Sequence, residues 1–245
     1  MSSSFIRSLL LGGELRINEP TLHAAYFDRW FCDKVNSCNG PAKQVFPQRG
    51  LPVILNNCPL DAVIWREGAI AEYETQRKTD LVSFNFSGCL MAGYEYNGGR
   101  RAAHIHVGGG ESHDCKKAWC EYVPSLDRSR MGRFVLFRPD GDRRERLIAK
   151  LRSDRVQFDD VSVMGVITAT FECYSVGLVL QTCDNMQLWQ VAFIEQHLAP
   201  TTFESYAEML RIEPSLWEQF YWNRMPVREL RLDRWRPWKM NLFGL

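Results

Sequence analysis

The chain has 245 residues, and its 30 lysines and arginines stand against 29 aspartates and glutamates, giving a formal net charge of +1. So balanced a charge gives no overall attraction to polyanions, and we therefore expect no nucleic-acid partner. Hydrophobic residues make up 45% of the chain and charged residues 24%, which excludes a disordered chain and indicates a globular fold that buries its own core.

Residues 1–50 differ in texture from the rest of the chain. Gly, Asn and Pro recur through them, which predicts a loop-rich N-terminal extension packed on the core, with one short helix in the aromatic stretch 24–31. The apolar run after Ser8 is too short for a membrane span or for the core of a secretion signal. We expect neither a membrane-spanning segment nor a cleaved leader.

Short apolar runs from Leu51 onward are typical of strands. They predict strands at 51–55, 62–65 and 81–86, with a helix over 67–78 between the last two. The next two runs, 89–96 and 101–107, flank Asn97-Gly98, the strongest short hairpin signal, because both residues tolerate a positive φ. These two runs therefore predict a β-hairpin.

The second half of the chain continues the mixed pattern. Strands are predicted at 118–123, 133–137 and 187–194, and helices from about 142 to 152, at 202–211 and at 214–222. The apolar stretch 161–180 is long enough to suggest a membrane helix, but its β-branched residues and nearby acidic residues favour buried strands joined by a turn. Together these elements predict a mixed α/β fold, with a β-sandwich core and flanking helices, in a single domain over residues 1–245.

The chain contains eight cysteines. An even number permits disulfides in an exported protein, but the density of cysteines does not require them. No two cysteines have the Cys-x-x-Cys spacing, which excludes a zinc ribbon and a thioredoxin-type motif. Most of them are expected to be small buried hydrophobic residues, as free cysteines usually are.

One cysteine, Cys89, has a distinctive setting. It follows Ser87-Gly88 directly, at the point where one predicted strand ends and the hairpin begins. Glycine lets the backbone turn sharply there, so that the thiol and the neighbouring amide N–H groups can point at one small volume. A nucleophile with an oxyanion hole needs this arrangement.

The hairpin returns two histidines to this cysteine. A turn centred on the Asn-Gly pair places His106 opposite Cys89, and a centre one residue later makes it a diagonal neighbour. His104 shares its strand parity, so both histidines can face the thiol. A nearby histidine lowers the pKa of a thiol and holds the proton in transit, the minimum for acyl transfer on an amide. Ser83 or a main-chain carbonyl would fix the imidazole tautomer.

These residues resemble the protein glutamine deamidases grouped around the catalytic domain of the cytotoxic necrotizing factors, the lethal-factor-type toxins and the chemotaxis receptor deamidase. The resemblance implies that Cys89 is the nucleophile and that His106, in a His-Val-Gly context similar to the His-Thr-Gly of the necrotizing factors, is the base. His104 competes for that role. The orienting group would be Ser83, where two branches place a threonine, and Phe86 replaces the usual leucine before Ser-Gly-Cys.

The resemblance also implies a cytotoxic-necrotizing-factor-like fold and a hydrolase that needs no cofactor and no metal. Its substrate would be a partner protein bearing a reactive glutamine, converted to glutamate through a thioester, or transglutaminated if an amine replaces water. Such a toxin or effector would act in a reducing cytosol, that of a host or target cell if the protein is exported, because the catalytic thiol must stay out of disulfides.

Other functions remain open. The same Cys89 and His106 pair could hydrolyse peptide bonds, as in a cysteine protease. Zinc binding is another alternative, although the spacing of the candidate ligands matches no common zinc module. Those ligands are His104, His106, His113, Cys115 and Cys120. A non-catalytic interaction domain could instead use the basic, tryptophan-containing tail 224–239, which either packs on the body or meets an acidic partner or anionic lipid headgroups.

Overall fold

The computed structural model describes residues 3–16, 50–65, 68–106, 115–183, 186–198, 200, 202–205 and 226–232. Its helices and strands, in chain order, are α1 (Ser4–Gly12), β1 (Glu14–Leu15), β2 (Gly50–Leu55), β3 (Cys58–Val63), β4 (Ile70–Thr75), β5 (Asp80–Ser83), β6 (Leu90–Tyr96), β7 (Gly99–Ile105), α4 (Cys115–Ser125), the 3-10 helix η2 (Arg128–Arg130), β8 (Met131–Phe137), α5 (Arg143–Ser153), β9 (Asp160–Ile167), β10 (Cys173–Cys183), β11 (Met186–His197) and β12 (Val227–Leu230).

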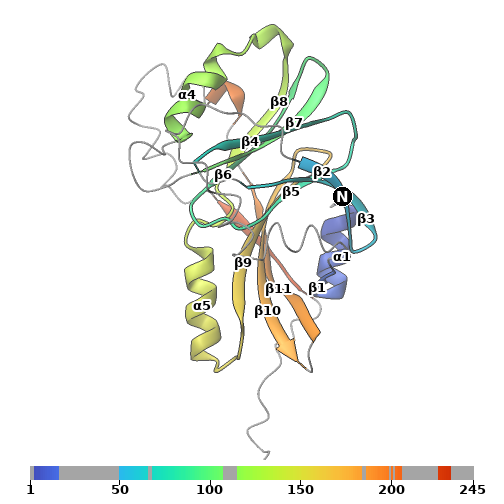
Figure 1. The fold of residues 1–245 in the computed structure, drawn as a ribbon, viewed down its shortest axis with the longest axis vertical. Coiled ribbons are helices and arrows are strands. Elements are labelled where there is room, and N and C mark those ends of the chain that lie inside the picture. Colours follow the sequence, from blue (N-terminus) through green and yellow to red (C-terminus); the bar gives the residue numbers. More distant parts are fainter. Residues whose placement is uncertain are drawn as a thin grey trace, which may run out of the picture.

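The described strands form two sheets (Figure 1). The large sheet has the strand order β1-β11-β10-β9-β5-β3-β2, with β12 added beside β11, and the small sheet has the order β4-β7-β6-β8. Neighbouring strands are antiparallel except β3 and β5, which run parallel. The fold is therefore mixed α/β with a strand-rich core and few helices, as the sequence predicts.

The two sheets pack face to face through a shared apolar layer. Ile167 of the large sheet meets Met91 and Phe137 of the small sheet in this layer. Two glycines allow the close approach: a Cβ at Gly93 would lie 2.7 Å from Ile167 Cδ1, and a Cβ at Gly165 would lie 2.7 Å from Met91 Sδ. Side chains on the inner faces are therefore enclosed between the sheets.

Helices cover the other faces. α1 packs Phe5, Ile6 and Leu9 on the outer face of the large sheet. α5 packs against β9 and β10 on the opposite face, beside the small sheet. α4 covers the outer face of the small sheet with Trp119 and Val123. In Figure 1, α5 and α1 flank the long strands β9 to β11, and α4 lies over the small sheet.

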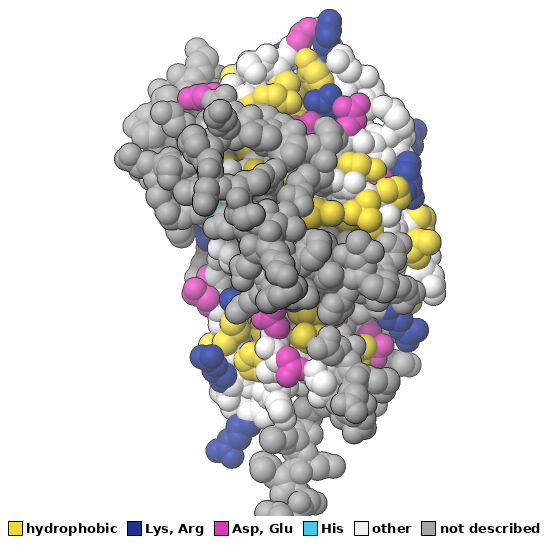
Figure 2. Space-filling view, in the orientation of Figure 1, with side chains coloured by type: hydrophobic (Ala, Val, Ile, Leu, Met, Phe, Trp, Pro, Cys, Tyr) yellow, Lys and Arg dark blue, Asp and Glu magenta, His cyan; other side chains and the backbone are white. Residues whose placement is uncertain are grey.

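Charged side chains of both signs are interspersed over the described part of the face shown in Figure 2. This distribution agrees with the net charge of +1. No helix in the described ranges is long and apolar enough to cross a membrane.

The predicted hairpin is confirmed. β6 and β7 pair with Tyr96 opposite Gly99, so the turn is centred on Asn97 and Gly98. Both turn residues have a positive φ, 52° and 76°, the conformation for which Asn-Gly is preferred. The strand β8, the helix α5 and the paired strands β9 and β10 also confirm their predictions.

The helix predicted over 67–78 is wrong, since this stretch contains the strand β4. Its glutamates and alanine favour a helix locally, but β4 pairs along its whole length with β7, from Ile70 opposite Ile105 to Thr75 opposite Arg100. Pairing at the edge of the small sheet outweighs the weak local preference.

The strand predicted at 118–123 is also wrong, because these residues belong to helix α4. Cys115, Trp119 and Val123 are spaced by four residues and are all buried against the small sheet. That spacing places them on one face of a helix, whereas a strand would alternate with a period of two.

The N-terminal region contains more regular structure than predicted. Residues 4–12 form α1, and Ser3 caps it by accepting a hydrogen bond from the backbone N–H of Ile6 at 3.2 Å. The helix predicted at 24–31 lies outside the described residues, as do most of the helices predicted at 202–211 and 214–222 and most of the tail 224–239.

Candidate active site

Cys89 lies at the sharp turn that precedes β6. Gly88 has a φ of 116°, a conformation that side-chain-bearing residues rarely adopt, so glycine is required there. Ser87 is exposed, Gly88 is half-buried, and Cys89 is 3% exposed. The turn therefore runs from the surface to the layer between the sheets.

The hairpin register places both histidines on the same sheet face as Cys89. Met91 lies opposite His104, and the same register continued to the start of β6 sets Cys89 opposite His106. Directly opposite residues of an antiparallel pair share a face, and so do residues two apart on one strand. Since Cys89 and Met91 belong to the apolar layer between the sheets, this face is the one that meets the large sheet.

Ser83 of the large sheet fixes the orientation of His104 of the small sheet. The Ser83 hydroxyl donates to the main-chain oxygen of Val63 at 2.7 Å and lies 2.8 Å from Nδ1 of His104. A hydroxyl has one hydrogen, so Ser83 Oγ accepts a hydrogen bond from the Nδ1–H of His104. The imidazole therefore carries its proton on Nδ1 and its lone pair on Nε2, the tautomer that a general base needs.

His104 is held as a neutral base. It is 1% exposed, and its ring stacks on Phe86 with the centroids 4.1 Å apart and the planes 2° from parallel. Burial holds the pKa of His104 well below its ordinary value, and the positive charge that His106 can carry lowers it further. Its Nε2 is buried and has no hydrogen-bond partner among the described side chains and backbone. Nε2 of His104 therefore keeps an unprotonated lone pair at neutral pH, which can accept a proton transiently during a reaction.

His106 has a different environment. Its Nδ1 accepts a hydrogen bond from the backbone N–H of Gly68 at 3.1 Å, and its own backbone N–H donates to Ala69 at 3.3 Å. Neutral His106 therefore carries its proton on Nε2, because its Nδ1 lone pair is occupied. Its ring meets Trp65 edge to face, with the centroids 5.8 Å apart.

A second serine and histidine pair lies in the same layer. The Ser175 hydroxyl donates to the main-chain oxygen of Pro139 at 2.6 Å and lies 2.8 Å from Nε2 of His197. Burial and the charge of Arg143 lower the pKa of His197 to about 3. Cys173 lies opposite His197, but burial raises the pKa of its thiol. This pair has no glycine turn at its cysteine.

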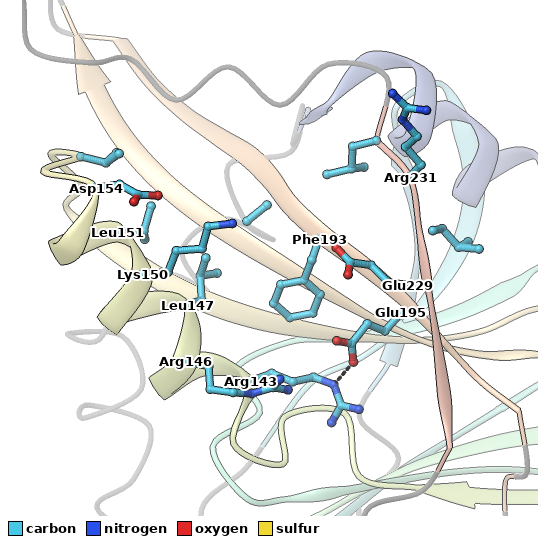
Figure 3. A pocket seen from close by; sticks show the side chains of 14 residues that line it. Arg143, Arg146, Leu147, Lys150, Leu151, Asp154, Phe193, Glu195, Glu229 and Arg231 are labelled. Carbon is cyan, nitrogen blue, oxygen red and sulfur yellow. Dashed lines mark hydrogen bonds and ion pairs between the residues drawn. The ribbon is translucent and has the colours of Figure 1, made fainter.

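The cavity in Figure 3 lies elsewhere. It has a volume of about 380 Å³ and runs between α5 and the β11–β12 pair, with Leu147 and Phe193 on its floor. Arg143 forms an ion pair with Glu195 inside it, and Lys150 and Arg231 lie on its two sides. Its charges are mixed, and none of the residues predicted for the active site lines it.

In the part of the chain that the structure describes, no three His, Cys, Asp or Glu side chains gather as metal ligands. Of the zinc ligands considered above, His104 is oriented by Ser83 and His106 accepts from Gly68. His113 lies outside the described residues.

Comparisons with protein-family models, with curated proteins and with solved structures found no match to this chain. The structure joins Ser83 to His104 directly and places Cys89 on their layer. Sequence reasoning missed Trp65 and the pair Ser175 and His197, for which no motif gives a signal.

Proposed function

We propose that this protein is a cysteine-dependent protein glutamine deamidase, with Cys89 as nucleophile, His104 as general base and Ser83 as the residue that positions the base. The observation that carries the proposal is the hydrogen bond between Ser83 and Nδ1 of His104, at 2.8 Å, in a layer that also holds Cys89. His104 is preferred to His106 because the Nδ1 lone pair of His106 is already used by Gly68. The proposed fold is that of the cytotoxic necrotizing factor catalytic domain.

The proposed reaction uses the side chains and one water molecule. Nε2 of His104 takes the thiol proton, Sγ of Cys89 bonds to the carboxamide carbon, and the C=O electron pair moves to oxygen. When that pair returns, the C–N bond breaks and His104 gives the proton to the leaving nitrogen, which departs as ammonia. Water then attacks the thioester, giving its proton to His104, and the C–S bond breaks to yield glutamate and the thiol.

The turn at Ser87 and Gly88 supports the same chemistry. Its positive-φ glycine turns the backbone sharply before Cys89, and a turn of this kind would let backbone amides reach the carboxamide oxygen where charge develops. The proposed place of action is a reducing cytosol, since Cys89 must stay a thiol.

The proposal is tested by mass spectrometry of proteins from cell extracts that have been incubated with the purified protein. We expect specific glutamines to become glutamates with the wild type and with Cys173→Ala, but not with Cys89→Ala. Cys173 is the matched control, because it is a buried cysteine that also lies opposite a histidine. Equal conversion by all three proteins, or none by any, would overturn the proposal. Cleaved peptide bonds in place of converted glutamines would favour the cysteine protease.

A further inference from the structure

Trp65 lies beside the candidate active site and has an unused hydrogen-bond donor. It follows β3 by two residues and packs against the apolar layer that contains Phe86 and Cys89. Its ring meets that of His106 at an interplanar angle of 64°. Its Nε1–H is buried and has no acceptor among the residues the structure describes.

An orphaned indole N–H calls for an explanation. The indole nitrogen can only donate, and a buried donor without an acceptor destabilises the folded protein. Buried polar groups are paired in the great majority of cases, and an exception calls for a reason such as a catalytic role or a bound water or ligand. The same site has a second orphan of opposite character, the acceptor Nε2 of His104.

The two orphans are complementary to one chemical group. A primary carboxamide offers a carbonyl oxygen that accepts a hydrogen bond and a nitrogen that takes a proton when it leaves as ammonia. Trp65 can supply the donor for the oxygen, and Nε2 of His104, once it holds the thiol proton, can give that proton to the nitrogen. Both are tied to β3, because the main-chain oxygen of Val63 anchors Ser83, which in turn orients His104.

We propose that Trp65 binds the substrate's carboxamide by donating its Nε1–H to the carbonyl oxygen. The bond strengthens as Sγ of Cys89 attacks, because the C=O electron pair moves to that oxygen and leaves it negatively charged. Trp65 then positions the carbonyl oxygen of the substrate and stabilises the oxyanion. This inference rests on the proposed deamidase function.

The direct test is NMR of the indole N–H signals after Cys89 has been modified. Chloroacetamide attaches a carboxamide to the thiol, whereas methyl methanethiosulfonate attaches only a methylthio group. We expect the Trp65 Nε1–H signal to move downfield with the first adduct and not with the second. The control is the indole signal of Trp189, which is buried in the apolar cluster that contains α1. This signal should stay in place with both adducts.

A variant provides a second readout. Trp65→Phe keeps an aromatic ring but removes the donor, and we expect it to lower the rate of Cys89 with chloroacetamide about tenfold. The rate with methyl methanethiosulfonate should be unchanged, as should both rates in Trp189→Phe. An unchanged ratio of the two rates in Trp65→Phe, or an unmoved Trp65 signal, would overturn the inference alone. A Cys89 that reacts with neither reagent in the folded wild type would overturn the proposed function as well.

Discussion

Replacing His104 with asparagine will lower the rate of Cys89-dependent deamidation by about 10²–10⁴-fold, the usual worth of a general base. The asparagine side chain has an amide N–H that can still donate to Ser83, but it has no second nitrogen to take the thiol proton. The variant should therefore keep its fold and lose rate in the chemical step. The measurement is the initial rate of deamidation, at neutral pH, of a protein whose glutamine the wild type converts to glutamate.

His197→Asn is the matched control for this experiment. His197 is also buried, is also hydrogen-bonded to a serine, and also has a ring nitrogen without a partner in the described part of the chain. Removing it should cost stability, and the rate of the folded variant should stay within about tenfold of the wild type. If the two variants lose rate equally, His104 has no special role in the reaction.

The free energy of unfolding will fall steeply as the pH drops below about 6.5, the ordinary pKa of histidine in an unfolded chain. The pKa of His104 is lowered in the folded protein, and that of His197 is lowered to about 3. Below pH 6.5 the unfolded chain binds protons that the folded protein does not bind. Each histidine therefore removes up to about 1.4 kcal/mol of stability per pH unit, down to its folded-state pKa.

The measurement is urea unfolding at a series of pH values, for the wild type and for the double variant His104→Asn, His197→Asn. The two buried histidines together should make the wild-type slope steeper by up to about 2.7 kcal/mol per pH unit. Burial raises the pKa values of Glu72 and Asp140, which has the opposite effect on the slope. Both carboxyls are present in the wild type and in the double variant, so their effect cancels in the difference between the two slopes. Equal slopes would show that the histidines titrate normally.

The features that could be predicted from the sequence are local. Asn97-Gly98 sets its own hairpin turn, and the turn then sets the register that brings His104 and His106 to the face of Cys89. The sharp backbone turn before Cys89 could likewise be predicted from Gly88, since only glycine adopts this φ readily. Each of these depends on a few adjacent residues.

The features that could not be predicted depend on the packing of two sheets. Ser83 and His104 lie on strands of different sheets, so nothing in their spacing distinguishes His104 from His106 as the partner of Ser83. The helix predicted over 67–78 and the strand predicted at 118–123 were wrong for a similar reason, because packing with the small sheet decides the structure of both stretches. Trp65 belongs to no sequence motif. Its unpaired N–H becomes informative only because the structure buries the indole nitrogen and packs the ring against His106.

The rate at which Cys89 is alkylated by iodoacetamide, measured against pH in the folded protein, tests the central claim most directly. A catalytic Cys89 should react near neutral pH at least about tenfold faster than Cys173, whose thiol has a raised pKa. His104→Asn should slow that reaction, and His197→Asn should leave it unchanged. A Cys89 that is alkylated only on unfolding, together with Cys173, would contradict the claim and make it a structural residue of the core.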